Sequence, residues 1–288
     1  MTCHRSVLIK GVAVLAGLGL LAPACTSSAG GLPHRSTAAT QPATTGALAT
    51  TTTEAPVPTT TQPPTTTTTE VQAAQPVPAS LVGAEWDKVP TTRHVVALTF
   101  DCGSNDAGVG SILATLQATH TPATFFMTGV FAQTYPSVAK EIGASHPIGN
   151  HTYNHMDLTK LSEAQVREEL LRAQSIILQT TGHHTRPLFR FPYGARDSRT
   201  IQLVNGLGYG DIYWTVDTLG WEGKSNGASV PLAISRVMAQ LQPGEIVLQH
   251  CGAANDGTTI DAHALQAIIQ GVEARGYSFV TLEQFVGP

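Results

Sequence analysis

Val95-Val96-Ala97-Leu98-Thr99-Phe100 is a run of six apolar or β-branched residues that stops at a carboxylate, Asp101. A continuous run of this kind is typical of a strand buried on both faces, as in a parallel sheet. Further short apolar runs follow along the chain, each separated from the next by a longer amphipathic stretch. This alternation predicts a parallel α/β fold in which helices connect successive strands.

We expect seven strands and six helices between residue 95 and the C-terminus. Ser162 and Gln165 form a capping box at the start of the clearest helix, and Asp261 is expected to cap the last one. A doubly wound sheet and an irregular barrel both satisfy this pattern. The expected strands are 95–100, 123–127, 147–149, 188–191, 212–216, 245–249 and 278–282, and the expected helices are 111–119, 136–144, 162–180, 198–207, 231–241 and 262–274.

The chain before this region has a different composition. Residues 1–24 predict an export signal, because an apolar segment too short to span a bilayer follows two basic residues and ends at the small-residue site Ala22-Pro23-Ala24. Residues 25–90 are rich in Thr, Pro and Ala. Such a segment cannot bury enough apolar surface to offset its conformational entropy, which predicts a disordered linker. Residues 91–288 are therefore expected to form the single folded domain.

Cys25 directly follows the predicted cleavage site. A cysteine there predicts a lipoprotein whose acylated thiol anchors the chain to the outer face of a membrane, with plain secretion and an uncleaved anchor as the alternatives. Each of these outcomes places the folded domain in an oxidising compartment. The net charge of −4 and the lack of a basic run argue against nucleic acid as a partner.

Polar residues with chemical potential gather just after the predicted strands. In a parallel α/β fold the carboxyl ends of the strands meet on one rim, where the sites of such folds lie. We therefore expect these residues to share one site. They are Asp101, His151, His155, Arg190, Tyr193, Asp217, Trp221 and His250.

Four of these residues suggest roles by their type and spacing. His151 and His155 can present both imidazoles to one metal ion if the segment is helical or turns tightly, and surface histidines in a polar loop are the alternative. Arg190 lies within an apolar strand, where an unpaired charge is costly, and Asp101 is the obvious partner. Asp101 itself fits either a catalytic group or a cap for the next helix.

Taken in order, five segments resemble the motifs of polysaccharide deacetylases of the NodB-homology type, carbohydrate esterase family four. The resemblance spans Val95 to about Leu282, essentially the whole expected domain. It implies a distorted (β/α) barrel of about seven parallel strands with the site at their C-termini. The segments are Thr99-Phe100-Asp101-Cys102-Gly103, His151-Thr152-Tyr153-Asn154-His155, Arg190-Phe191-Pro192-Tyr193-Gly194, Trp214-Thr215-Val216-Asp217 with Trp221, and Leu248-Gln249-His250.

The same resemblance implies hydrolysis of an acetylated polysaccharide and a role for each residue. Asp101 would be the general base, held ionised by Arg190. The backbone N–H of Tyr193 would meet the tetrahedral oxyanion, and His250 would protonate the departing nitrogen as general acid. The residues expected to contact the substrate are Pro192, Tyr193, Trp221 and Leu248.

The resemblance further implies a divalent metal ion, expected to be Zn²⁺, with His151 and His155 as ligands. Such an ion lowers the pKa of its bound water to about 7. The family's third protein ligand is an aspartate, and this chain carries Cys102 at that position. We expect Asp106 to reach the vacated place, with capping of the following helix as its alternative role.

A second departure from the family is Gly220, which stands where an acidic residue usually precedes the fourth-motif Trp. We expect Asp217 to support His250 in its place. The leading hypothesis is an N-acetyl deacetylase acting on peptidoglycan or a similar extracellular glycan. An O-acetyl esterase of the same fold and a catalytically inactive glycan-binding module are the alternatives. The presence of Asp101, Arg190 and His250 favours an enzyme, because a pure binder needs no acid and base together.

Cys102 and Cys251 are the cysteines of the expected domain, and each directly follows a catalytic candidate. A disulfide, two metal ligands and two unrelated thiols are the alternatives. Zinc ligation by both would complete a closed His2Cys2 shell, which leaves no position for water. A disulfide suits the oxidising compartment and is the favoured expectation.

Overall fold

A computed structural model describes residues 77–286 of the 288-residue chain. The predicted export signal, the greater part of the predicted linker and the predicted lipidation site Cys25 lie outside the described residues. Within residues 77–286, no helix is both long enough and apolar enough to cross a membrane.

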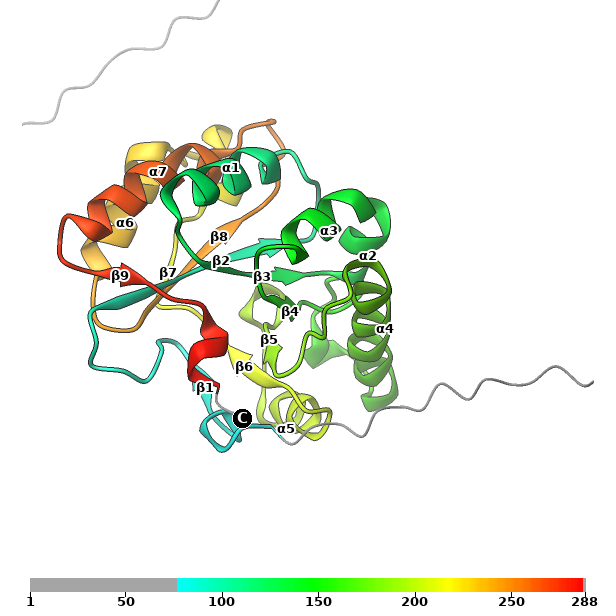
Figure 1. Cartoon of the computed structure of the whole chain (residues 1–288). Helices are drawn as coiled ribbons and strands as arrows, with labels where there is room; N and C mark the ends of the chain where they lie inside the picture. The colour runs from blue at the N-terminus through cyan, green and yellow to red at the C-terminus, as the bar shows by residue number, and fades with distance from the viewer. Residues whose placement is uncertain (1–76, 287–288) are drawn as a thin grey trace, which may run out of the picture. The chain divides into compact units, whose positions relative to one another are not determined.

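The strands pair in parallel and form one sheet that curls into a partial barrel (Figure 1). The order across the sheet is β1-β6-β5-β4-β3-β2-β8-β7, and β9 pairs with the start of β2. The parallel α/β fold and the distorted barrel are thus confirmed. The strands are β1 (Glu85–Trp86), β2 (Val95–Cys102), β3 (Ala123–Met127), β4 (Ile148–Asn150), β5 (Leu188–Phe189), β6 (Gly210–Ile212), β7 (Val216–Asp217), β8 (Glu245–His250) and β9 (Ser278–Phe279).

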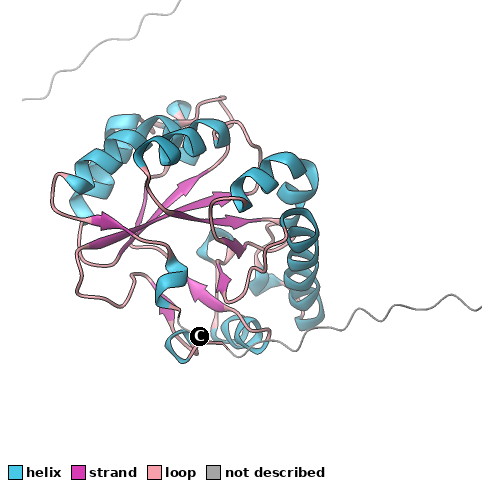
Figure 2. Cartoon of the chain, in the orientation of Figure 1, coloured by secondary structure: helices cyan, strands magenta, loops and turns pink. Residues whose placement is uncertain are grey.

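The helices surround the sheet on its outer side (Figure 2). Helices α1, α6 and α7 pack together beside β2 and β8, and α2, α3 and α4 pack together beside β3 and β4. The six predicted helices are present within two residues of their expected bounds, and Ser162 makes the predicted capping box. The helices are α1 (Val109–Thr119), α2 (Gly129–Thr134), α3 (Pro136–Gly143), α4 (Glu163–Thr181), α5 (Ser198–Gly206), α6 (Val230–Gln240) and α7 (Ile260–Glu273).

One predicted strand, 212–216, is two strands in the structure. Its first residue ends β6, which pairs with β1 and β5, whereas Val216 begins β7, which pairs with β8. The two strands lie far apart in the sheet order, with β7 at its edge. The sequence does not mark the break between the two strands, because Ile212-Tyr213-Trp214 stays apolar while the chain leaves β1 and β5 and reaches β8.

The predicted linker also extended too far. Leu81, Trp86 and Val89 are at most 5% exposed and belong to an apolar cluster that includes side chains of β2, β3, β5, β6 and β8. A Cβ at Gly210 of β6 would lie 2.4 Å from the Cβ of Leu81, so the two segments are in close contact. Residues 77–90 therefore belong to the fold, and their apolar side chains were overlooked among the Pro and Thr of the preceding stretch.

Two smaller differences concern helices. The short helix α2 was not predicted; its N-cap is Thr128, whose hydroxyl accepts from the N–H of Phe131. Asp261 does not cap α7 as predicted, because the N-cap is Thr259 and Asp261 lies inside the first turn. Its side chain is buried and faces the strand ends instead.

The segment 77–90 can be tested by truncating one buried side chain. We expect Leu81→Ala to lower the free energy of unfolding by about 2–5 kcal/mol, because it leaves a cavity in the apolar cluster. The neighbouring Val82→Ala is the matched control, since Val82 is 58% exposed, and should change stability by about 0.5 kcal/mol or less. Urea denaturation measures both. Equal effects of the two substitutions would mean that this segment is a linker after all.

Candidate active site

The register between β2 and β8 brings Asp101 and His250 together. The two strands pair with Asp101 opposite His250, and the N–H of Cys251 donates to the Asp101 carbonyl at 3.0 Å. Opposite residues of a parallel pair point to the same face of the sheet, and both side chains line one cavity of about 600 Å³. The other lining residues are Gly103, Ser104, His151, His155, Phe191, Tyr193, Trp214, Asp217, Trp221, Leu248, Gly252 and Ala253.

Arg190 is fully buried directly after β5 and holds Asp101. Its Nη1 donates to Asp101 Oδ1 at 2.8 Å, while its Nε and Nη2 donate to the carbonyls of Ile212 and Tyr213. The predicted partnership of these two charges is present. Burial alone would raise the pKa of Asp101, but the positive charge of Arg190 and the neighbouring imidazoles outweigh it, so the pKa lies below its usual range. Asp101 is therefore ionised at neutral pH.

His151 and His155 meet through a tight turn after β4. Thr152 and His155 have left-handed φ angles of 65° and 60°, and the N–H of Thr152 is held by the side chain of Asn150 at 2.9 Å. His151 Nδ1 lies 2.9 Å from the Arg190 carbonyl, which assigns its proton to Nδ1 and leaves the Nε2 lone pair free. Burial lowers the pKa of His151, and burial together with His151 lowers the pKa of His155 to about 3.

The two imidazoles suit a divalent cation. Their Nε2 atoms lie 3.1 Å apart, near the roughly 3.3 Å between two nitrogens on one tetrahedral zinc ion. The lowered pKa values keep both rings neutral, which is the form that binds metals. Asp101 Oδ2 is 3.4 Å from His151 Nε2. No set of three or more His, Cys, Asp and Glu side chains converges as a metal cage anywhere in residues 77–286, so the donor set is two imidazoles with Asp101 beside them.

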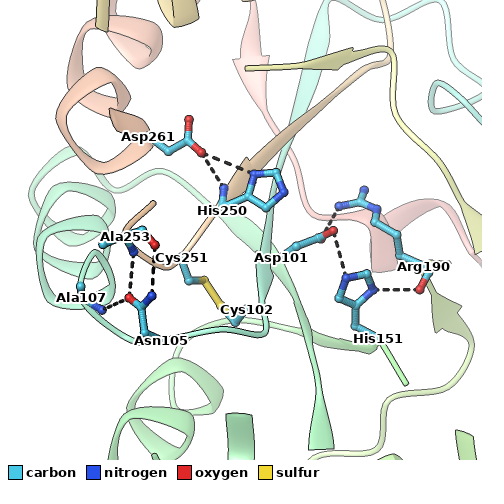
Figure 3. The surroundings of a disulfide bond; sticks show 10 residues. All are labelled: Asp101, Cys102, Asn105, Ala107, His151, Arg190, His250, Cys251, Ala253 and Asp261. Carbon is cyan, nitrogen blue, oxygen red and sulfur yellow. Dashed lines mark hydrogen bonds and ion pairs between the residues drawn. A yellow bond between two sulfur atoms is a disulfide. The ribbon is translucent and has the colours of Figure 1, made fainter. Parts of the chain in front are cut away.

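Cys102 and Cys251 form a disulfide next to this site (Figure 3). Their Cα atoms are 5.0 Å apart, well within the range that a disulfide requires. Because successive side chains of a strand point to opposite faces, the cysteines that follow Asp101 and His250 point away from the cavity, into the apolar cluster under α1 and α7. Cys102 is therefore not a metal ligand in this structure.

The structure does not bring Asp106 to the histidines. Asp106 does not line the cavity, and α1, the helix that Asp106 was expected to cap, begins at Val109 without a side-chain cap. The preceding Asn105 explains the path of the loop, because its side chain donates to the Ala253 carbonyl at 3.1 Å and accepts from the Ala253 N–H at 2.8 Å. This clamp ties the loop to the end of β8, away from the turn that carries the histidines.

Aromatic residues form much of the cavity wall. Tyr193 has a left-handed φ of 60°, is 72% exposed and lies edge-on to His155, with the ring centres 4.6 Å apart. Trp221 is 51% exposed and lies beside His250. Leu248 of β8 also lines the cavity. Pro192, by contrast, is buried and does not line the cavity, so it shapes the turn rather than contacting a ligand.

Asp217 does not support His250 in the way the sequence suggested. Its Oδ1 accepts from the N–H of Leu219 at 2.8 Å and its Oδ2 accepts from Trp221 Nε1 at 3.3 Å, so both oxygens serve the loop after β7. The carboxylate beside His250 is that of Asp261. Burial lowers the pKa of His250, but Asp261, with Asp101 and Asp217 further away, outweighs it and raises the pKa above its usual value.

Sequence reasoning missed Asp261 as a site residue, although a signal was present. Asp261 shares one face of α7 with Leu265, Ile268 and Val272, at positions i, i+4, i+7 and i+11. All four side chains are buried. A carboxylate on the apolar face of an amphipathic helix must have a partner inside the protein, and this position should have outweighed the cap hypothesis.

Comparison with known proteins shows the family of this chain. A sequence model described as "Polysaccharide deacetylase" matches residues 88–212. The peptidoglycan-N-acetylglucosamine deacetylase of Bacillus cereus is 32% identical over 196 residues, which cover 67% of this chain and 68% of that protein. The chain therefore belongs to the polysaccharide deacetylase family, carbohydrate esterase family four, as its motifs predicted.

Solved structures show the same relationship. The family 4 carbohydrate esterase PdaA of Bacillus subtilis superposes with a TM-score of 0.65 at 27% identity, covering 72% of this chain and 87% of that one. A family 4 pseudoenzyme from Bacillus anthracis superposes with a TM-score of 0.64 at 26% identity, covering 71% and 69%. The fold is thus shared by relatives with and without activity, and the individual residues must decide between them.

The disulfide can be tested by its effect on stability. Reduction of the wild-type chain should lower its free energy of unfolding by about 2–4 kcal/mol, because the bond closes a loop between residues 149 positions apart. Urea denaturation with and without reductant measures the difference. The Cys102→Ala/Cys251→Ala variant is the control and should not respond to reductant. Peptide mapping that finds both cysteines as free thiols in the unreduced chain would contradict the assignment.

Proposed function

We propose that this chain is an exported, metal-dependent hydrolase that removes N-acetyl groups from a cell-wall polysaccharide such as peptidoglycan. The observation that carries the proposal is an ionised Asp101 and a His250 of raised pKa lining one cavity from adjacent strands. Amide hydrolysis needs such a pair, since water must lose a proton and the departing nitrogen must gain one. The substrate named for the Bacillus cereus relative supports the choice of peptidoglycan.

Asp101 acts as the general base. Its Oδ1 is bound to Arg190, so its Oδ2 is the oxygen left to accept a proton from the attacking water. The ion pair keeps the carboxylate of Asp101 charged. The two carbonyl groups bound by Arg190 fix the orientation of its guanidinium, and the guanidinium in turn fixes the orientation of the carboxylate. The barrier falls because the base is already oriented when the water arrives.

His250 acts as the general acid. Its raised pKa increases the protonated fraction at neutral pH, and the side of the ring away from Asp261 presents Nε2 to the cavity.

The acetyl group of the substrate has its own contacts in this proposal. Its methyl group fits against Leu248 and Trp221, which are the apolar groups next to His250. In the described residues the N–H of Tyr193 donates to no other group, so it is free to stabilise the oxyanion.

His151 and His155 are proposed to hold a divalent ion, expected to be Zn²⁺. When bound, such an ion acidifies a water molecule and polarises the acetyl carbonyl. The 3.1 Å separation of the two Nε2 atoms supports this proposal. With Cys102 in a disulfide and Asp106 outside the cavity, water or substrate would complete the coordination.

A catalytically inactive glycan-binding module is the second candidate. The disulfide at Cys102 favours it, because the family's third metal ligand is replaced by a residue that points away from the cavity. A binding module, however, gives no reason for a buried Arg190 that holds Asp101 ionised.

For the location of the protein, we propose export by the signal over residues 1–24 and anchoring to a membrane through Cys25.

Acetate release from purified peptidoglycan tests the enzyme. We expect Asp101→Asn and His250→Asn each to reduce the rate by about 10²- to 10⁴-fold, because each removes one proton transfer. His263→Asn, an exposed histidine on α7, is the matched control and should retain full activity. Rates of both site variants equal to wild type would contradict the roles. A wild-type chain that binds glycan without releasing acetate would establish the binding module, and release only from O-acetylated glycan would establish an esterase.

Metal content tests the two imidazoles separately from activity. We expect His151→Ala/His155→Ala to lose the stoichiometric divalent metal of the wild-type chain, measured by inductively coupled plasma mass spectrometry. The exposed pair His183→Ala/His184→Ala is the matched control and should retain the metal. Chelation of the wild type should also stop acetate release, and addition of Zn²⁺ should restore it. Metal retained by the His151→Ala/His155→Ala variant would show that the ion binds elsewhere.

A further inference from the structure

His250 has one partner on the side of its ring that faces away from the cavity. Its Nδ1 lies 3.6 Å from Asp261 Oδ2, and its backbone N–H donates to the same oxygen at 2.8 Å. Among the described residues Nδ1 is buried with no closer partner. Side chain and backbone of His250 therefore face one carboxylate oxygen, and a small rotation of the ring would close the remaining distance to a hydrogen bond.

The carboxylate of Asp261 is itself fixed. Its Oδ1 accepts from the Thr218 hydroxyl at 2.6 Å, and the N–H of Thr218 donates to the Leu248 carbonyl of β8 at 3.1 Å. Asp261 is 3% exposed on the apolar face of α7. A buried charge at this position costs stability unless it has such partners. The arrangement therefore points to a role for the carboxylate itself.

Gly220, directly before Trp221, explains how this carboxylate reaches His250. A Cβ at position 220 would lie 2.3 Å from Asp261 Oδ1, and its three nearest neighbours would all be atoms of the Asp261 carboxylate. The φ angle of Gly220 is outside the left-handed region, so its backbone conformation does not require glycine. Glycine is required because Asp261 occupies the space of a side chain.

We propose that Asp261 is the positioning residue for His250, holding Nδ1 so that Nε2 faces the cavity, and that Gly220 lacks a side chain to make room for it. The inference rests on the proposed role of His250 as general acid. The other ionisable groups around His250 are Asp101 on β2, Asp217 on β7, and His151 and His155 in the turn after β4. Among the carboxylates, Asp261 is the one within 4 Å of a ring nitrogen of His250.

Nitrogen-15 NMR of the full chain tests the contact without any change in sequence. A proton on Nδ1 that faces Asp261 should make the neutral form of His250 the Nδ1-H tautomer. The signal is assigned by comparison with His250→Gln. Observation of the Nε2-H tautomer in the neutral form would overturn the proposal, whether or not the chain releases acetate.

Asp261→Asn tests the consequence for proton donation. Loss of a negative charge beside His250 should lower its pKa by about 1 unit or more. Because His250 donates only when protonated, activity falls as pH rises through this pKa. The alkaline limb of the kcat profile should therefore move to lower pH, and kcat at neutral pH should fall about 10- to 100-fold. Glu273→Gln, exposed on the same helix, is the control and should leave the profile unchanged. A lower kcat with an unmoved alkaline limb would mean a purely structural role.

Relocation of the carboxylate tests the relation with Gly220. Gly220→Asp alone should impair the enzyme, because two carboxylates would compete for one space. Gly220→Asp/Asp261→Ala should recover at least about tenfold in kcat over Asp261→Ala and restore the raised pKa of His250 in the NMR titration. A double variant no better than Asp261→Ala on both measures would overturn the proposal. If the wild type released no acetate, the proposed function would fail while the tautomer and pKa measurements still judged Asp261.

Discussion

The parallel register between β2 and β8 is the constraint on which the rest of the site depends. It sets Asp101 opposite His250 and, one residue later, brings Cys102 and Cys251 close enough for a disulfide. Side-chain alternation along the strands then sends Asp101 and His250 into the cavity and the cysteines into the core. A shift of one residue would reverse both, because every side chain would change faces.

The buried charge of Arg190 connects this strand pair to the other half of the barrel. Its guanidinium binds Asp101 of β2 and two carbonyls at the end of β6. The Arg190 carbonyl accepts a hydrogen bond from Nδ1 of His151. Asp101 and His151 are thus oriented by one residue. A charge with no exposed surface is tolerated here because its hydrogen bonds are made within the protein.

Most of this fold and a large part of the site could be predicted from the sequence. The strand ends and the five motifs located Asp101, His151, Arg190 and His250, because short-range patterns mark strands and parallel topology gathers their ends. The division of 212–216 between two distant strands of the sheet was not predicted, since an apolar run looks the same when it changes partners. The support of His250 was assigned to Asp217, whereas the structure gives it to Asp261. The periodicity of α7 indicates that Asp261 is buried, but it does not indicate which residue Asp261 contacts. Its contact with His250 depends on the space left at Gly220, where a Cβ would lie 2.3 Å from the Asp261 carboxylate.

A crystal structure of the Asp101→Asn variant with a bound N-acetylglucosamine oligosaccharide would test most directly whether this cavity is a deacetylase site. We expect the acetamide to lie between the substituted side chain at position 101 and His250, with its nitrogen within hydrogen-bond reach of His250 Nε2 and its methyl group against Leu248. An oligosaccharide bound elsewhere on the chain, with no acetamide in the cavity, would contradict the assignment of Asp101 and His250 as the base and the acid.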